Sequence, residues 1–333
     1  MHIPDNYLSP ETCAVMTAAM VPVWGHAIKK IKREVPKEKM PMLGVGAAFS
    51  FTGMMFNIPL PGGTTGHAVG GTLLSAMLGP EAACISITIA LLIQALIFGD
   101  GGILAFGANC FNIAFVLPFV GYGLFRLLLK AFGDSENNPV SDGKRVLAAA
   151  IASYAGINAA AFTTAVEFGI QPYLFHDAAG QALYCPYGLD IAIPAMMIGH
   201  LTVFGAAEVI FTAAVYAFVL KTAPSAAGSL SGKAGVSDTS DRKQWPVYAL
   251  LGALICAVPA GLLATGTAWG EWEVTEVGIE KKFDFSSIFP DYSVSGLPEV
   301  AGYILSAIIG VALVIIIFRV IAALMKSKTD YAD

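Results

Sequence analysis

Nine apolar stretches dominate the sequence, and each is long enough, or nearly long enough, to cross a lipid bilayer. A spanning helix needs about 20 apolar residues, because the hydrocarbon core is about 30 Å thick and a helix rises about 1.5 Å per residue. Only 13% of the 333 residues are charged, against about 25% in soluble domains. We therefore expect an integral membrane protein whose apolar stretches lie near residues 11–28, 42–57, 67–80, 81–98, 104–130, 144–168, 189–220, 246–265 and 300–325.

The backbone of these stretches must satisfy its hydrogen bonds without water, which leaves helices or a closed barrel. The sequence lacks the alternation of apolar and polar residues that a barrel requires. Lys and Arg residues gather on cytoplasmic loops. With the N-terminus outside, all of the 19 Lys and Arg residues except Lys281 and Lys282 fall on the cytoplasmic side. The sequence thus predicts an all-α multi-pass protein of the cytoplasmic membrane, with a seven-helix bundle, a two-helix transmembrane hairpin and a cytoplasmic C-terminus.

A stretch rich in Gly, Ser and Ala interrupts the apolar pattern at residues 222–243, and such a composition is typical of a flexible linker. It divides the chain into a seven-helix metal-binding unit at residues 1–221, a cytoplasmic linker at 222–244 and a two-helix accessory segment at 245–333. The accessory segment contains a long outer loop, residues 266–299, with these acidic side chains: Glu271, Glu273, Glu276, Glu280, Asp284 and Asp291. This layout indicates a membrane unit fused to an accessory subunit.

The first two residues together form a metal chelator. Met1 supplies a terminal amine, and His2 supplies its main-chain nitrogen and its imidazole Nδ1, so that one ion closes two fused chelate rings. His67 ends the glycine-rich segment 59–67, which lies on the same outer face because two helices separate it from His2. Its imidazole completes four nitrogens in a plane, an arrangement suited to Ni²⁺ or Cu²⁺ and acceptable to Co²⁺. The alternatives are a frayed terminus and an interfacial histidine bonded to a carbonyl.

Three further polar residues are candidates for supporting roles. Asp100 and Asn109 belong to a second outer, glycine-rich turn. They either shape that turn and cap a helix or orient a ligating imidazole. Glu208 lies in the middle of the seventh helix, where a carboxyl group is costly and needs a partner or a neutral state. It supports coupling, contacts a partner subunit or forms a buried interhelical hydrogen bond.

Missing motifs exclude several classes of activity. The sequence has no Gly-x-x-x-x-Gly-Lys-Ser/Thr, so the chain does not hydrolyse ATP with a P-loop, and no His-Glu-x-x-His of the metalloprotease type. No Ser-His-Asp arrangement is indicated either. We expect a protein that is not an enzyme, with no catalytic residues, no cofactor and no nucleic-acid partner. Among the other histidines, His26 and His176 are interpreted as structural, and His200 is too far from Glu208 to pair with it.

Three short segments carry a resemblance to a known family: MHIPD at residues 1–5, PGGTTGH at 61–67 and FGDGG at 98–102. They closely resemble the CbiM/NikM family, the substrate-binding membrane components of energy-coupling-factor (ECF) ABC transporters for cobalt and nickel. The resemblance covers about residues 1–220, and its motifs are specific.

The resemblance implies a function as well as a fold. It implies a seven-helix component in which Met1, His2 and His67 hold Ni²⁺ or Co²⁺ as the transported substrate. It also implies capture of the ion from outside and import powered by ATP that partner subunits hydrolyse, namely a transmembrane coupling protein with two ABC-type ATPases. A membrane metal-sensing receptor and an ion-coupled secondary carrier remain alternatives. Nitrogen ligands do not separate nickel from cobalt, because both metals accept them.

Residues 245–325 resemble the small two-helix component, NikN or CbiN, that is fused to some members of the family. The segment FPDYS at residues 289–293 fits that component. At residues 270–273, GEWE stands where the usual PDGLE sequence follows the first helix. The resemblance thus implies an accessory hairpin within the same chain.

Overall fold

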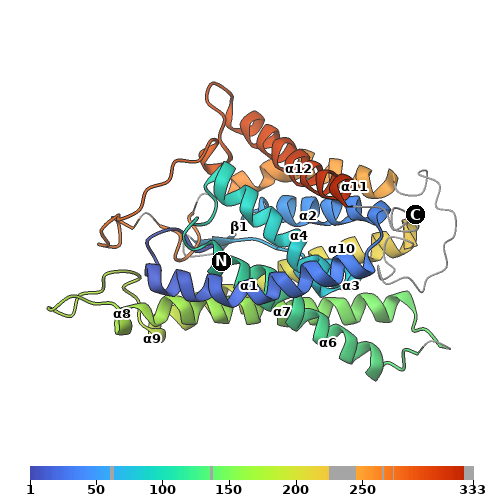
Figure 1. The fold of residues 1–333 in the computed structure, drawn as a ribbon, viewed down its shortest axis with the longest axis horizontal. Helices are drawn as coiled ribbons and strands as arrows, with labels where there is room; N and C mark the ends of the chain where they lie inside the picture. The colour runs from blue at the N-terminus through green and yellow to red at the C-terminus, as the bar shows by residue number, and fades with distance from the viewer. Residues whose placement is uncertain (61–63, 136–137, 225–244, 265, 273, 326–333) are drawn as a thin grey trace, which may run out of the picture.

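The computed structural model describes residues 1–60, 64–135, 138–224, 245–264, 266–272 and 274–325. Most helices run along the long axis of one bundle, and many of the connecting loops lie at its two ends (Figure 1). Every apolar stretch that the sequence predicts overlaps a helix. The α-helices are α1 (Pro10–Glu34), α2 (Met40–Met54), α3 (Gly71–Leu78), α4 (Pro80–Ile93), α5 (Phe106–Asn109), α6 (Leu117–Ala131), α7 (Asp142–Gly169), α8 (Gln171–Leu174), α9 (Leu189–Gly199), α10 (Gly205–Thr222), α11 (Trp245–Ala257) and α12 (Glu299–Leu324).

A π-helical segment at Gln94–Phe98 extends α4, and two others join helices into longer rods: Cys110–Val116 joins α5 to α6, and His200–Phe204 joins α9 to α10. Six helical segments of the described chain are long and apolar enough to cross a membrane: Pro80–Phe98, Phe106–Ala131, Asp142–Leu174, Leu189–Thr222, Trp245–Leu263 and Glu299–Leu324. α3 has eight residues and so rises only about 12 Å. The structure is that of a helical membrane protein, while the count of nine spanning helices and their orientation stay predictions.

α1 begins where its sequence provides a cap. The Ser9 side chain accepts a hydrogen bond from the main-chain N–H of Thr12 at 3.1 Å, and Pro10 occupies the first helical position. Proline is favoured there because its missing N–H has no partner in the first turn. Residues 1–9 are therefore left as a separate segment, and this segment is largely buried in the bundle rather than frayed.

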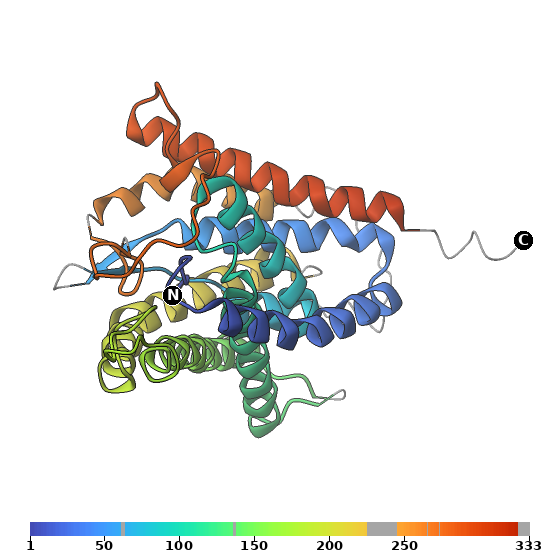
Figure 2. The same cartoon turned by 60° about the vertical axis from the view of Figure 1, so that its left-hand side comes forward.

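A short β-hairpin precedes α3, a feature that the all-α prediction did not include. β1 (Ile58–Leu60) pairs antiparallel with β2 (Thr64–Gly66), with Ile58 opposite Gly66. The tip of the predicted loop, residues 61–63, lies outside the described residues. The hairpin, the N-terminus and the loop that precedes α12 lie at one end of the bundle (Figures 1 and 2). His67 follows β2 directly and so lies at this end.

The accessory segment packs against the bundle. α12 runs along α2, and a Cβ at Gly310 of α12 would collide with the Phe51 ring of α2, so glycine permits this close approach. The Tyr303 hydroxyl of α12 also donates to the main-chain oxygen of Met55 at 2.7 Å. The predicted linker at 222–244 lies almost wholly outside the described residues. The loop that precedes α12 is thereby brought over the N-terminal segment, to which Lys282 and Phe283 are bonded.

Candidate metal centre

Residues 1–5 are held in place by the turn that follows α4. The Asn109 side chain binds the main chain of Ile3 twice, accepting from its N–H at 2.7 Å and donating to its oxygen at 3.0 Å. The Ile3 oxygen also accepts the N–H of Gly102 at 2.8 Å. The Asp5 carboxylate accepts the N–H groups of Ile103 and Leu104 at 3.0 and 2.8 Å. These hydrogen bonds fix the position of the terminal segment in the bundle.

His2 and His67 meet at this point, as the sequence predicts. His67 Nε2 lies 3.3 Å from His2 Nδ1, and the ring centroids are 5.0 Å apart. The side chains are buried, with 2% and 8% of each residue exposed. Two nitrogens at neighbouring corners of a square, each about 2.0–2.1 Å from one ion, lie about 2.9 Å apart. The observed distance between His67 Nε2 and His2 Nδ1 is thus a few tenths of an ångström longer than the distance expected for two ligands of one ion.

Hydrogen bonds fix the segment that carries His67. Glu208 of α10 accepts the N–H of Val69 at 2.7 Å and that of Gly70 at 3.0 Å, and Gly70 has a φ of 73°. Ser50 donates its hydroxyl to the Val69 oxygen at 2.8 Å. His67 Nδ1 lies 3.2 Å from the Ala68 oxygen. A proton on Nδ1, directed at that carbonyl, leaves the Nε2 lone pair free to bind a metal. Of the three roles considered for Glu208 (coupling, contact with a partner subunit, or a buried hydrogen bond), this geometry fits the buried hydrogen bond, with the carboxylate as acceptor.

The two predicted supporting residues have different surroundings. Asp100 Oδ1 lies 3.1 Å from His2 Nδ1, the nitrogen that the predicted chelate uses. Its Oδ2 accepts the Tyr292 hydroxyl at 2.5 Å and the Gln94 amide at 3.1 Å. The Asn109 side chain makes its hydrogen bonds to the main chain of Ile3 and not to an imidazole. Asp100 therefore sits beside the histidine ring, whereas Asn109 positions the backbone.

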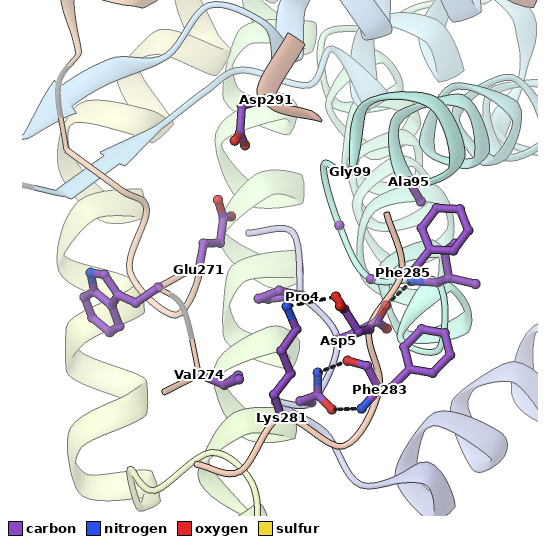
Figure 3. A pocket seen from close by; sticks show the side chains of 16 residues that line it. Pro4, Asp5, Ala95, Gly99, Glu271, Val274, Lys281, Phe283, Phe285 and Asp291 are labelled. Atoms are coloured by element: carbon purple, nitrogen blue, oxygen red, sulfur yellow. Dashed lines mark hydrogen bonds and ion pairs between the residues drawn. The ribbon is translucent and has the colours of Figure 1, made fainter. Parts of the chain in front are cut away.

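A carboxylate of the accessory loop meets the terminal amine. Glu271 Oε1 lies 3.3 Å from the Met1 nitrogen, and the Met1 side chain is buried. A cavity of about 570 Å³ opens beside these groups and is lined by Glu271, His2, His67 and Asp100 among others. A second, smaller pocket lies between the N-terminal segment and the accessory loop, with Glu271 beside it (Figure 3). The sequence marked Glu271 only as one acid of an outer loop.

Burial sets the charge of two groups at this centre. Burial, followed by the nearby His2 and the terminal amine, lowers the pKa of His67 well below its ordinary value. The neutral imidazole is the form that binds metals. Burial and then the adjacent Asp100 raise the pKa of Tyr292, which keeps its hydroxyl as a donor. Both shifts preserve the neutral forms.

The side chains alone do not make a metal site. Across the parts of the chain that the structure describes, no group of three or more His, Cys, Asp and Glu side chains is arranged to hold a metal ion. Any metal held by His2 and His67 would therefore need ligands besides these side chains. Of the remaining histidines, His26 lies near Glu81 and His176 is exposed in a loop, whereas His200 is buried near the centre, where its Nδ1 bonds to the Met196 oxygen.

Comparison with known proteins identifies the family. The family model described as "cobalt uptake substrate-specific transmembrane region" matches residues 2–226, and the PDGLE domain model matches residues 243–327. This chain belongs to the CbiM family. It carries the PDGLE domain in its C-terminal part, and the resemblance seen in its sequence is confirmed. The CbiM region contains both histidines, whereas Glu271 and Tyr292 come from the PDGLE region.

Two curated relatives are similar to this chain along nearly their whole length. The probable fused nickel transport protein LarMN of Lactiplantibacillus plantarum is 47% identical, over 96% of this chain and 97% of that one. The fused nickel transport protein NikMN of Rhodobacter capsulatus is 43% identical, over 95% of each. A crystal structure of a truncated transition metal transporter is 57% identical with a TM-score of 0.61, and the match covers 66% of this chain and 99% of that chain.

Proposed function

We propose that this chain is the substrate-binding membrane component of an ECF-type transporter that imports Ni²⁺ or Co²⁺. The observation that carries the proposal is the 3.3 Å separation of His67 Nε2 and His2 Nδ1 beside a buried N-terminus. Buried nitrogens at this spacing suit a transition metal and not a hard cation, which prefers oxygen ligands. The nickel transport names of two full-length relatives support the choice of substrate.

The proposed ligands are the Met1 amine, the His2 main-chain nitrogen, His2 Nδ1 and His67 Nε2. Two contacts give way when the ion enters: the amine leaves Glu271, and His2 Nδ1 leaves Asp100. Both carboxylates then face a dication rather than their former donors. The ion is substrate and not a cofactor, so the same contacts are available to reform after release.

The supporting residues act on the position of these ligands. Asn109 fixes the main chain of Ile3, directly after the His2 chelate. Glu208 fixes the backbone two and three residues after His67. Asp100 restricts the His2 ring from the side of the cavity. We assign Glu208 to this positioning role, because both of its oxygens accept main-chain N–H groups of the His67 segment.

The proposed assembly follows from the family resemblance. The resemblance to the CbiM/NikM family implies that two partner ATPases supply the energy for import through a transmembrane coupling protein, and the lack of a P-loop in this sequence is consistent with that division of labour. We propose a metal-binding unit at residues 1–221, a linker at 222–244 and an accessory segment at 245–333, in the cytoplasmic membrane with the N-terminus outside. The ranges of the two family matches, 2–226 and 243–327, support this division.

Two experiments test the proposal. The first measures Ni²⁺ and Co²⁺ bound by the purified full chain and by His2→Ala and His67→Ala, with His176→Ala as a control because His176 is exposed and away from the centre. Each substitution at the centre should lower affinity by about 100-fold or more, since it removes a direct ligand. Unchanged binding by both variants would refute the site.

The second experiment measures metal uptake by cells that express the chain with or without its partner subunits. Uptake should need partner ATPases with an intact P-loop lysine. Uptake by vesicles in a proton gradient alone would identify a secondary carrier instead. Binding without any uptake, together with a signal passed to a kinase or regulator, would identify a receptor.

A further inference from the structure

The outer loop of the accessory segment is fixed to the N-terminal segment by hydrogen bonds close to the proposed chelate. Asn6 Oδ1 accepts the N–H groups of Lys282 and Phe283 at 3.0 and 2.8 Å, and Asn6 Nδ2 donates to the Phe283 oxygen at 2.8 Å. Tyr7 donates its hydroxyl to the Trp272 oxygen at 3.0 Å. The loop and residues 1–7 therefore keep one relative position.

Glu271 is aimed at the terminal amine by the turn before it. Its N–H donates to the Ala268 oxygen at 3.0 Å. Gly270 has a φ of 82°, and a Cβ there would lie 2.9 Å from the Phe168 ring. Only glycine adopts this backbone without strain while it packs against the ring. The turn thus places Glu271 Oε1 3.3 Å from the Met1 nitrogen, and 24% of the Glu271 side chain is exposed.

The neighbouring cavity gives an ion access to this carboxylate. Its volume of about 570 Å³ exceeds the roughly 200 Å³ of an ion with six waters, at about 30 Å³ for each water. Glu271 lines the cavity together with His2, His67 and Asp100. An ion inside this cavity therefore has the Glu271 carboxylate in the surrounding wall, together with His2 and His67.

Glu271 lies near the position that an ion bound to the Met1 amine would occupy. A metal bound to the Met1 amine lies about 2 Å from that nitrogen, and Glu271 Oε1 is 3.3 Å from the same nitrogen. An amine that binds a metal no longer offers its positive charge to the carboxylate, and the dication takes its place. The oxygen therefore lies within about 5.3 Å of the ion, which is the sum of the two distances.

We propose that Glu271 donates a carboxylate oxygen to the bound ion as a fifth ligand and thereby determines metal specificity. This inference rests on the proposed function, because it needs the ion at the nitrogens of Met1, His2 and His67. Four nitrogens in a plane bind Cu²⁺ more tightly than Ni²⁺ or Co²⁺. An added oxygen stabilises Co²⁺, which favours five or six ligands, more than it stabilises Cu²⁺, whose tetragonal geometry makes axial bonds weak. Glu271 thus offsets part of the preference for copper.

The test compares Glu271→Gln with the wild-type full chain, and uses Glu276→Gln as a matched control because Glu276 is exposed on the same loop. Affinities are measured for Co²⁺, Ni²⁺ and Cu²⁺, and the visible absorption spectrum of bound Co²⁺ reports its coordination number. Glu271→Gln should weaken Co²⁺ binding by about tenfold, change Cu²⁺ binding much less and alter the Co²⁺ spectrum. Glu276→Gln should change none of these, and Glu271→Asp should restore part of the Co²⁺ affinity.

Three results overturn the inference. They are an unchanged Co²⁺ affinity in Glu271→Gln, an unchanged Co²⁺ spectrum, or an equal loss for all three metals, which indicates attraction by charge and no ligand bond. Failure of the site itself gives a different result, because His67→Ala then retains wild-type binding. The two failures are therefore distinguishable in one set of titrations.

Discussion

His67 Nε2 lies 3.3 Å from His2 Nδ1 although 65 positions of sequence separate the two residues. The chain builds this contact from two sides. Asn109 binds the backbone of Ile3 on one side, and Glu208 binds the backbone after His67 on the other. Since neither positioning residue bonds an imidazole directly in these contacts, the geometry of the pair depends on the backbone that each one holds.

One residue added before Met1 should abolish metal uptake. Met1 is 4% exposed and its amine meets Glu271, so an added residue has no space unless the terminal segment moves. A chain beginning Gly-Met-His also offers one amine, two main-chain nitrogens and one imidazole, which fill a square without His67. Uptake by cells, rather than binding, is therefore the measurement. Normal accumulation by a chain whose extra residue is verified by mass spectrometry contradicts the prediction.

Metal affinity should fall as the pH drops from 8 to 6. Ligand nitrogens must lose protons before they bind, so binding releases protons. The lowered pKa of His67 keeps its ring neutral over this range, so the loss comes from the other nitrogens. Each proton released at binding changes the affinity by about tenfold per pH unit. Isothermal titration of Ni²⁺ in buffers of different ionisation enthalpy counts the protons, and a flat pH profile contradicts the proposed main-chain ligand.

The metal-free protein should lose stability as the pH falls below the ordinary histidine value of 6.5. The folded-state pKa of His67 is lowered, so between the two pKa values the unfolded chain binds more protons than the native one. Stability then rises with pH and is lost as pH falls. The melting temperature of the wild type should drop more between pH 7 and 5 than that of His67→Gln. Equal drops in the two proteins contradict this assignment.

The sequence predicts some of this centre and misses the rest for physical reasons. Apolar length predicts the helices, and the chemistry of a Met-His terminus predicts Met1 and His2 as ligands. His67 is predicted from its glycine-rich loop on the same face and from the family resemblance. The partner of the terminal amine, Glu271, lies 270 positions away, and no periodicity or spacing links the two. Tyr292 likewise reaches Asp100 across 192 positions. Such contacts depend on how the accessory segment packs, which local sequence patterns do not encode.

The β-hairpin and the short α3 were missed for a different reason. The sequence predicts a glycine-rich loop near residues 59–67, followed by an apolar stretch at 67–80 that is nearly long enough to span a membrane. In the structure a two-stranded ladder uses part of the loop, and α3 is left with eight residues. The backbone groups between them bond to Glu208 and Ser50. Buried side-chain acceptors and donors thus replace helical bonds, and composition alone does not reveal them.

Glu208→Ala should weaken Ni²⁺ binding by about tenfold or more, because positioning groups near metal ligands have effects of that size. The substitution removes the acceptor for the N–H groups of Val69 and Gly70, and the His67 segment then loses its fixed position. Glu208→Gln keeps one acceptor oxygen and should retain more affinity. Glu167→Ala is the control, since Glu167 is a buried carboxylate on α7 that binds Asn112 instead. Equal effects of Glu208→Ala and Glu167→Ala would indicate a general loss of packing.

Gly102→Ala should lower metal affinity by displacing the terminal segment. A Cβ at residue 102 would lie 2.5 Å from the main-chain nitrogen of Asp5, which is too close for any real contact, so the backbone of residues 3–5 must shift. A shift of about 1 Å is enough to misplace groups that bind a metal.

Gly123→Ala is the matched control, because nothing lies within 4 Å of a Cβ at that position. Titration of both purified variants with Ni²⁺ should give wild-type affinity for Gly123→Ala and a clear loss for Gly102→Ala. Since the strain falls on the terminal segment, the melting temperature of metal-free Gly102→Ala should stay close to that of the wild type. A large drop in the melting temperature would place the damage in the helix bundle instead.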